Sequence, residues 1–411
     1  MQDNEKKPAL RFKGFTDPWE QRKLEEYLEV SGQKNFEGIY TKEDVLSVSG
    51  DFGIVNQIEF QGRSFAGASV ANYGVVETGD IVYTKSPLKS NPYGIIKANK
   101  GKNGIVSTLY AVYKPKQSAN PEFVQIYFEQ DARMNNYMHP LVNKGAKNDM
   151  KVSAENALKG QIVFPDIKEQ RTISEFFHNL DTLITLHQRK YEKLVNIKKS
   201  MLDKMFPQNG VSVPEIRFKG FTDPWEQRKL GEIAKEVVRN DPASDAPIMM
   251  ITAGNGFIEQ SDRYAFNNAG ESLKKYILLE RGELAYNHGA SKLRPYGSCF
   301  ALTTVEKARI PFVYHCFSVE KSNPEFLSIE LNGANVENQL RKIVSSGARM
   351  DGLLNIAYSE YTEVTVQLPK KEEQDWIAKF FKHLDTLITL HQRKLEKLQN
   401  IKKSCLEKMF V

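Results

Sequence analysis

Two stretches of this 411-residue sequence occur twice, and this repetition constrains the fold more than any other feature. The phrase at residues 11–24 returns unchanged at 217–230 and reads RFKGFTDPWEQRKL. The phrase at residues 180–190 returns at 384–394 and reads LDTLITLHQRK. The offsets of the two pairs are 206 and 204 residues. The chain is therefore one repeat of roughly 205 residues used twice in tandem, which predicts a pseudo-twofold architecture.

Composition places the chain among ordinary globular proteins, with 40% hydrophobic and 26% charged residues. No apolar run approaches the ~20 residues that a membrane-spanning helix needs. The first ten residues show no apolar signal region, and the three cysteines have no metal-ligand spacing, so a cytoplasmic location is expected. The net charge of +6 permits a polyanionic partner without requiring one.

A long helix is predicted at the end of each repeat, from about residue 169 to 206 and again in the second copy. Apolar residues recur there at steps of four and three, and no glycine or proline interrupts them. About 35 residues make a helix roughly 50 Å long, so we expect the two helices to pack as an antiparallel pair. The positions expected at the seam between them are Ile173, Phe177, Leu180, Ile184, Leu194, Ile377, Phe381, Leu384, Ile388 and Leu398.

Polar residues interrupt this seam at the same places in both copies, namely His187, His391, Lys198 and Lys402. We expect the histidines to be interface residues rather than metal ligands, because the sequence offers no third ligand nearby.

The first repeated phrase is predicted to form a turn followed by a helix. Thr16 and Asp17 would supply a helix cap, and Pro18 suits the first helical position. Trp19 and Trp225 are predicted to be buried anchors of their repeats.

The bodies between the repeated phrases, at about 31–165 and 237–369, differ in sequence but keep a common skeleton. Three motif pairs share an offset of 203 residues: GDIVY (79–83) with GELAY (282–286), PYG at 92–94 and 295–297, and NPEF at 120–123 and 323–326. Short β-rich segments separated by glycine, proline and asparagine flank these motifs. The predicted fold class is therefore α+β, with two pseudo-symmetric domains of mixed α/β structure separated by an antiparallel pair of long coiled-coil helices. The predicted segments are 1–165 (first body with its frame), 166–207 (first helix), 208–369 (linker, second frame and body) and 370–411 (second helix).

A frame that is the same in both repeats, with loops that differ in sequence, predicts two recognition surfaces on one scaffold. The loops mix cations, aromatic rings and amides, which can contact phosphates and base edges. The competing interpretation of each residue is an ordinary solvated loop. The candidate DNA contacts are Tyr83, Lys85, Ser86, Lys89, Tyr93, Lys97, Lys147, Lys151, Tyr286, Asn287, His288, Lys292, Arg294, Tyr296 and Arg349.

No catalytic or metal-binding pattern holds in both copies. The segment from Asn91 to Tyr93 hints at an amino-methyltransferase motif, but it lacks a second proline and has Arg294 at the matching position. We interpret it as a turn. The GNG sequence at 254–256 is too short for a cofactor-binding glycine loop. We therefore expect no catalytic residue and no metal ligand.

Taken together, these motifs resemble the specificity subunit of type I restriction-modification enzymes. The resemblance covers essentially the whole chain and includes the lead-in to each long helix, VFPDIKEQRTI at 163–173 and QLPKKEEQDWI at 367–377.

The resemblance implies that each body is a target recognition domain that reads one half of a bipartite double-stranded DNA target in the major groove. The helices would fix the gap between the half-sites. The chain itself would hold no cofactor and perform no catalysis. Two modification subunits would supply S-adenosylmethionine and adenine methylation, and restriction subunits would supply the motor and nuclease. Two alternatives remain open: an assembly scaffold that binds no DNA, and a self-contained DNA methyltransferase or nuclease.

Overall fold

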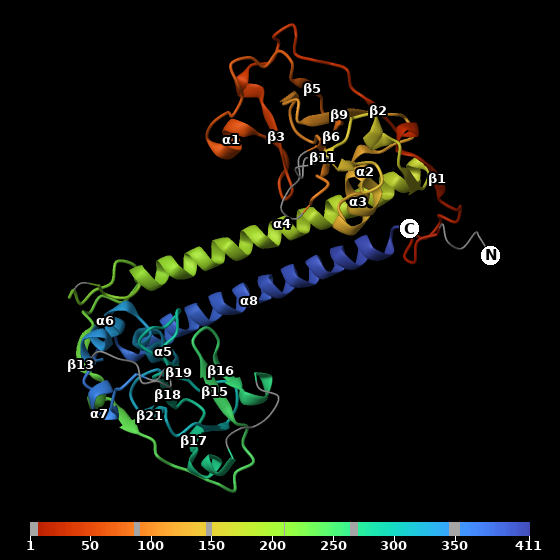
Figure 1. Ribbon diagram of the computed structural model, residues 1–411. Helices are drawn as coiled ribbons and strands as arrows, with labels where there is room; N and C mark the ends of the chain where they lie inside the picture. The colour runs from red at the N-terminus through yellow and green to blue at the C-terminus, as the bar shows by residue number, and fades with distance from the viewer. Residues whose placement is uncertain (1–6, 86–90, 145–149, 209, 264–269, 345–353) are drawn as a thin grey trace. The chain divides into compact units, whose positions relative to one another are not determined.

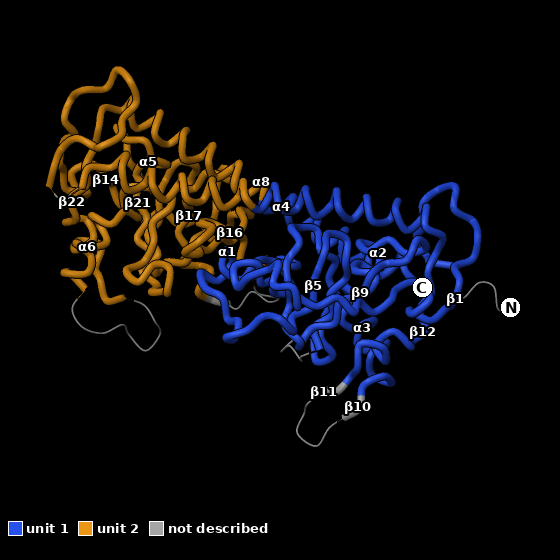
Figure 2. Tube along the Cα trace, turned by 90° about the horizontal axis from the view of Figure 1, so that it is seen from above, with its two compact units in different colours: residues 1–188, 392–411 blue, residues 189–391 orange. Residues whose placement is uncertain are grey.

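The computed structural model describes residues 7–85, 91–144, 150–208, 210–263, 270–344 and 354–411. It contains two compact units, coloured separately in Figure 2. Unit 1 joins Met1–Gln188 to Gln392–Val411, and unit 2 is Arg189–His391. The units do not follow the repeat boundary, because each long helix contributes one half to each unit.

The two long helices are α4 (Ile167–Lys204) and α8 (Lys371–Lys408), with 38 residues each. They lie side by side in Figure 1. In unit 1 the Lys402 amine is 2.8 Å from an Asp181 carboxylate oxygen, and in unit 2 Lys198 is 2.5 Å from Asp385. The earlier residue in α4, Asp181, pairs with the later one in α8, and the later residue in α4, Lys198, pairs with the earlier one in α8. The predicted antiparallel arrangement is therefore confirmed. The lysines that interrupt the predicted seam thus make ion pairs between the helices.

The predicted seam residues lie in two environments. Near the start of each helix their side chains are buried, and all except Leu180 belong to the core that the helix shares with the body: Ile173, Phe177, Leu180, Ile377, Phe381 and Leu384. Nearer the middle of each helix they are half-buried: Ile184, Leu194, Ile388 and Leu398. The apolar stripe is therefore most deeply buried where each helix begins.

Unit 1 is built on a four-stranded antiparallel sheet of order β2-β9-β6-β7, with two-stranded sheets β1-β12, β3-β4, β5-β8 and β10-β11 around it. Its strands are β1 (Glu20–Lys23), β2 (Leu28–Val30), β3 (Leu46–Ser49), β4 (Gly53–Asn56), β5 (Gly74–Val76), β6 (Ile81–Thr84), β7 (Ile96–Ala98), β8 (Gly104–Val106), β9 (Tyr110–Pro115), β10 (Asn143–Lys144), β11 (Met150–Lys151) and β12 (Gln161–Phe164). Its shorter helices are α1 (Gln57–Gln61), α2 (Pro121–Tyr127) and α3 (Asp131–Met138).

Unit 2 repeats this plan with a four-stranded sheet of order β14-β21-β18-β19 and the two-stranded sheets β13-β22, β15-β16 and β17-β20. Its strands are β13 (Glu226–Lys229), β14 (Ala234–Glu236), β15 (Met249–Thr252), β16 (Gly256–Glu259), β17 (Ile277–Glu280), β18 (Leu284–Asn287), β19 (Ser298–Ala301), β20 (Lys307–Ile310), β21 (His315–Val319) and β22 (Thr365–Leu368). Its shorter helices are α5 (Pro324–Leu331), α6 (Ala334–Ile343) and α7 (Tyr358–Tyr361). The prediction of two pseudo-symmetric bodies of mixed α/β structure is confirmed.

The helix predicted after Pro18 is wrong. The segment forms strand β1, which pairs along its length with β12, followed by one 3-10 turn at Leu24–Glu26. Its partner strand lies about 140 residues further along the chain, and such tertiary pairing overrides the local capping signal. The predicted burial of Trp19 and Trp225 is confirmed, at 1% and 4% exposed.

The NPEF motif starts a helix in each unit. The Asn120 side chain accepts a hydrogen bond from the Phe123 backbone N–H at 2.9 Å, and Pro121 occupies the first turn of α2. Asn323 caps α5 in the same way. An asparagine cap followed by proline fits the free N–H groups at a helix start, which explains why both copies retain this motif.

The Glu-Gln pair of each lead-in holds the long helix to its body. Gln170 is fully buried, donates to the Pro165 carbonyl at 2.9 Å and accepts from the Asn120 N–H at 2.9 Å. Beside it, Glu169 is 1% exposed and binds the Arg11 guanidinium through both carboxylate oxygens, each at 2.7 Å. Unit 2 repeats both contacts with Gln374 and with the pair of Glu373 and Arg217.

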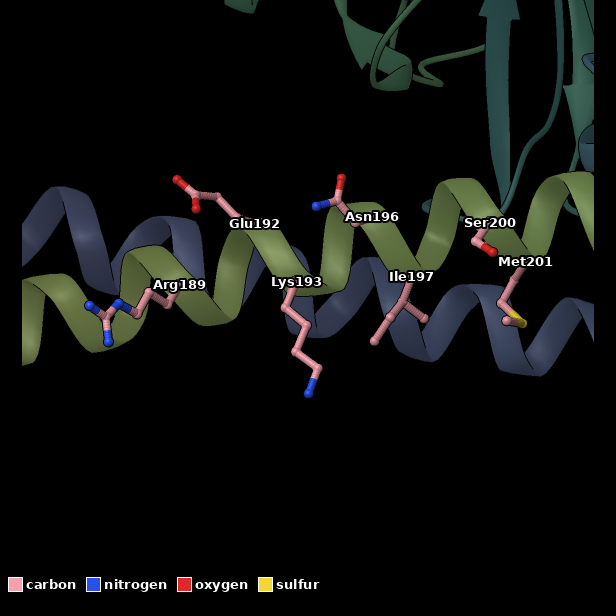
Figure 3. A pocket seen from close by; sticks show the side chains of 7 residues that line it. All are labelled: Arg189, Glu192, Lys193, Asn196, Ile197, Ser200 and Met201. Carbon is pink, nitrogen blue, oxygen red and sulfur yellow. The ribbon is translucent and has the colours of Figure 1, made fainter. Parts of the chain in front are cut away.

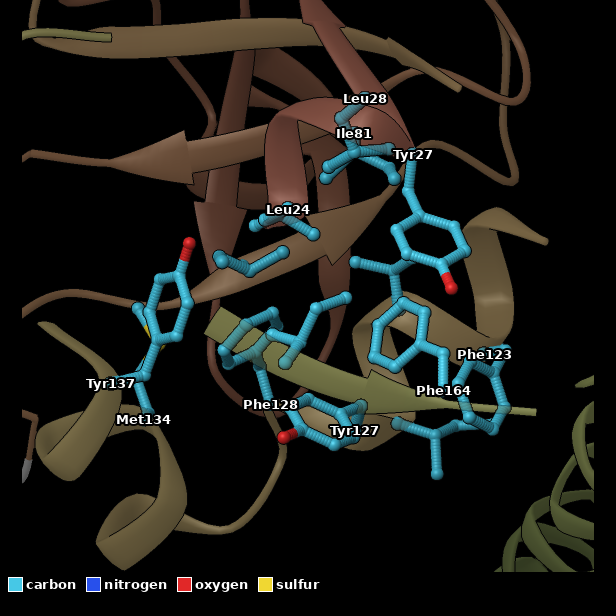
Figure 4. Close-up of a cluster of buried hydrophobic side chains, with 14 of the residues drawn as sticks. Leu24, Tyr27, Leu28, Ile81, Phe123, Tyr127, Phe128, Met134, Tyr137 and Phe164 are labelled. Carbon is cyan, nitrogen blue, oxygen red and sulfur yellow. The ribbon is translucent and has the colours of Figure 1, made fainter. Parts of the chain in front are cut away.

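The core of unit 1 is rich in aromatic rings, several of which Figure 4 shows. It includes Phe410, just after α8, whose ring centroid lies 5.7 Å from that of Phe123 and 6.1 Å from that of Trp19. In unit 2 the equivalent place is taken by Phe206, just after α4, 5.7 Å from Phe326 and 5.8 Å from Trp225. Each long helix therefore begins against one body and completes the core of the other unit.

A buried carboxyl group predicts a pH dependence for unit 2. Glu330 in α5 is 4% exposed and accepts a hydrogen bond from the Gln367 N–H at 3.0 Å. Burial raises the pKa of Glu330 to about 7 from an ordinary 4.5, although the bonds from Gln367 and Asn335 oppose the rise. The folded state therefore holds this proton more tightly than the unfolded state, and unfolding free energy falls as pH rises from about 4.5 to 7, by about 3 kcal/mol in total.

We expect urea unfolding of unit 2 to move to lower urea between pH 5 and pH 8, and Glu330→Gln to reduce that movement. Unit 1 provides an internal comparison, because Tyr127 occupies the matching place in α2. An unchanged pH profile in the Gln variant would contradict the prediction.

Candidate nucleic-acid interface

Most of the candidate DNA contacts lie on or beside two equivalent hairpin loops, the one that joins β6 to β7 and the one that joins β18 to β19. The strand ends carry Tyr83 and Tyr286, which are 0% and 1% exposed. Their role as DNA contacts is therefore wrong. Both lie in the middle of a sheet and point into the core, and burial raises the pKa of both hydroxyls well above the usual range.

These tyrosines instead hold the loops in shape. The Tyr83 hydroxyl donates to the Tyr93 carbonyl at 2.8 Å, and that of Tyr286 donates to the Tyr296 carbonyl at 2.6 Å. The PYG turn that follows needs glycine, since Gly94 has φ +78° and a Cβ there would lie 2.0 Å from the Thr84 carbonyl oxygen. The interpretation of the segment from Asn91 to Tyr93 as a turn is confirmed, since the Gly94 N–H donates to the Asn91 carbonyl at 2.9 Å. The common skeleton thus fixes the base of each loop and leaves its outer residues free to vary.

In the unit 2 loop, some candidate DNA-contacting side chains form hydrogen bonds that hold the loop in shape. Asn287 donates to the Ile251 carbonyl at 3.1 Å and accepts from the Gly289 N–H at 2.9 Å. Arg294 is half-buried and donates to the Asn332 carbonyl at 2.6 Å, and burial lowers its pKa. Lys292 is exposed, while His288 and Tyr296 are half-buried. Within this loop, Lys292 is the candidate cation whose side chain is most open to a ligand.

In the unit 1 loop, Lys85 and Tyr93 are half-buried. Desolvation, followed by the charge of Lys34, lowers the pKa of Lys85. Lys97 is 7% exposed, and its side chain lines a pocket together with Asp181 and Lys402. Its proposed role as a DNA contact is wrong, because β7 turns this side chain inward, where burial lowers the pKa of its amine.

Several candidates cannot be placed. Ser86, Lys89, Lys147 and Arg349 lie outside the described residues. Lys151 is in β11, and only its backbone is described.

An exposed aromatic pair in unit 1 was missed from the sequence. Phe52 follows β3 and is 67% exposed, and its ring centroid lies 5.1 Å from that of Phe60 in α1, which is 45% exposed. The matching β15–β16 turn of unit 2 carries Gly254 and Asn255 instead. Aromatic residues in a polar turn that differs between the copies are the signal that could have revealed the pair.

Within the described ranges, no cluster of three or more histidine, cysteine or acidic side chains could hold a metal ion. A search of the same residues finds no helix long and apolar enough to cross a membrane. The geometry thus offers two scaffolded loop surfaces.

No family model matches the sequence, but solved structures match it over nearly the whole chain. The S subunit of the type I restriction-modification system from M. genitalium has 12% identity and a TM-score of 0.58, covering 98% of this chain and 99% of that one. The HsdS subunit from Thermoanaerobacter tengcongensis has 16% identity and a TM-score of 0.42, covering 95% and 96%. A structure on complex assembly and conformational transition of the type I R-M system has 14% identity and the same TM-score, covering 95% and 97%.

Of these TM-scores, only the first is high enough to show a shared fold. At 12% identity the similarity concerns the fold. Over almost its whole length, this chain has the fold of a type I restriction-modification S subunit.

Proposed function

We propose that this chain is the DNA-binding specificity subunit of a type I restriction-modification complex. Each body would read one half of a bipartite target through its variable loops. The antiparallel helices would set the gap between the half-sites. Methylation with S-adenosylmethionine and DNA cleavage would be performed by partner subunits, in the cytoplasm.

The observation that carries the proposal is the division between constant and variable parts. The two units share strand order, capping motifs and buried ion pairs, but the outer residues of the β6–β7 and β18–β19 loops differ. Two copies of one enzyme would keep the same side chains in both sites. Two readers on one frame need different ones, which favours an asymmetric DNA target.

The constant surface supports docking of two copies of one partner. Strand β1 and its equivalent β13 have the same sequence, EQRK, and all eight side chains are exposed. Packing does not require exposed residues to be identical. We therefore propose that β1 and β13 each contribute to a site for one modification subunit.

A graft tests the two-reader model. Replacing residues 31–160 by those of a relative with another target should change one half-site and leave the other and the gap intact. The graft keeps β1 and β12 together, so the frame of unit 1 is preserved. The measurement is methylome sequencing of cells that carry the grafted chain with its modification and restriction subunits.

The control graft replaces only residues 11–24, which should change neither half-site. A change in both half-sites after the body graft would contradict the model. The enzyme alternative is tested separately by incubating the purified chain alone with DNA and S-adenosylmethionine, where methyl transfer would overturn the assignment of catalysis to partners.

A further inference from the structure

The positive charge of this protein is concentrated in the C-terminal halves of its two long helices. Residues 188–204 include six lysine or arginine and two acidic residues, a net charge of +4, and residues 392–408 have the same balance. The whole chain has a net charge of +6. The remaining residues, which include both bodies, therefore have a net charge of −2.

Four positions that are cationic in both helices are exposed, and these eight side chains are Arg189, Lys190, Lys193, Lys199, Arg393, Lys394, Lys397 and Lys403. As far as the structure describes the chain, none of them forms an ion pair or a side-chain hydrogen bond. Cations on the bodies are often paired, as Lys114 is with Glu77 at 2.5 Å and Arg281 with Glu306 at 2.7 Å. The helix cations are thus left available for an anionic ligand.

Two of these cations, Arg189 and Lys193, line a groove on α4 together with Glu192, and Figure 3 shows it. Arg189 and Lys193, one turn apart, extend from the same side of the helix, while Glu192 and Asn196 extend from the other. Asn196 and Ser200 also line the groove, and α8 carries the same residue types at Arg393, Lys397, Asn400 and Ser404. Arginine, lysine, asparagine and serine are among the side chains that contact phosphate oxygens in protein–DNA complexes.

We propose that the C-terminal halves of α4 and α8 form two equivalent surfaces that bind the phosphate backbone of double-stranded DNA. The inference rests on the proposed function and assigns the electrostatic part of DNA binding to these two helix surfaces. DNA binding draws much of its affinity from cations that neutralise phosphates and release counterions. The bodies at 31–165 and 237–369 have net charges of +3 and −2. Each helix half, in contrast, presents four unpaired cations over about 15 Å. The bodies would then read the bases, and the helices would contribute affinity that does not depend on the DNA sequence.

The test uses the full chain, alone and assembled with its modification subunit, and a labelled random-sequence duplex of about 40 base pairs. The variant is Arg189→Gln, Lys193→Gln, Arg393→Gln and Lys397→Gln together. Its control is Lys168→Gln, Arg171→Gln, Lys321→Gln and Lys379→Gln, four exposed cations that lie outside the helix halves. The readout is the slope of log Kobs against log salt concentration, measured by fluorescence anisotropy.

If all four residues bind phosphates, the slope should become shallower by about 3 to 4, since each phosphate contact contributes about 0.9. The control should change it by less than one contact. Arg189→Lys with Arg393→Lys should keep the wild-type slope, because both charges remain. An unchanged slope in the glutamine variant would overturn the inference. If that variant also lost binding of the modification subunit, the surface would be assigned to a protein partner.

The two proposals fail in different ways. A glutamine variant with an unchanged slope and a wild-type preference for one target sequence would overturn only the helix surface. A wild-type complex with no preference for any sequence would overturn the proposed function as well.

Discussion

Phe410→Ala is expected to unfold the core of unit 1 locally and to cost about 3–5 kcal/mol of unfolding free energy there. The Phe410 ring is 5% exposed and lies among the rings of Trp19, Phe123 and Phe177. The Arg133 guanidinium lies over its outer side, 4.8 Å from the ring centroid. Removing the ring leaves a cavity that these large neighbours cannot fill, and cavities in aromatic cores are costly.

Hydrogen exchange read by mass spectrometry separates the units. In the Phe410→Ala variant, peptides from β9 and α2 should exchange faster, while those from β21 and α5 keep wild-type protection. The matched variant is Phe206→Ala, with a ring at the equivalent place in unit 2, and it should give the opposite pattern. Equal effects of both variants on both units would contradict the reciprocal completion of the cores.

Breaking the buried ion pair of unit 1 is expected to have an effect of similar size. Arg11→Met leaves the Glu169 carboxylate, which is 1% exposed, without its bidentate partner. An uncompensated buried charge costs about 3–5 kcal/mol, whereas replacing both charges by apolar groups is often close to neutral. The double variant Arg11→Met with Glu169→Leu should therefore be more stable than either single variant.

Thermal unfolding followed by circular dichroism gives this comparison, and Arg217→Met with Glu373→Leu repeats it in unit 2. The equivalent pair is a fair replicate because Glu373 is also 1% exposed and its contacts are 2.7 and 2.6 Å long. If the double variant were less stable than both single ones, the pair would contribute net stability that apolar packing does not replace.

Much of the fold could be predicted because its strongest signals are local or repeated. Ten positions in regular steps, eight of them apolar, identify α4, and the same steps in α8 support it. The short strands follow from β-rich stretches such as Ile81–Thr84. The helix predicted after Pro18 failed because β1 is stabilised by β12, which is distant in sequence. Local sequence patterns do not reveal a partner strand that is so distant along the chain.

The candidate site could be predicted only in its location. The loops around residues 83–97 and 286–296 were found, but which side chains leave them was not. Tyr83 and Lys97 lie in strands whose residues are buried on both faces of the sheet. The sequence alone did not show that both faces are covered. The exposed cations of α4 and α8 were missed for another reason. The apolar positions of these segments define the helix, and the surplus of lysine on the other positions becomes informative once their exposure is known.

The two interhelical ion pairs have a consequence for how such a protein can change its length. They are related by the pseudo-twofold, with Asp181 facing Lys402 and Lys198 facing Asp385. Sliding one helix past the other breaks both pairs at once, and no shift preserves one at the expense of the other. The register is therefore fixed from two places, although each half-exposed pair adds little stability. An insertion in one helix alone would pull one pair out of alignment, so a longer or shorter version of this pair must arise through matched changes in both repeats.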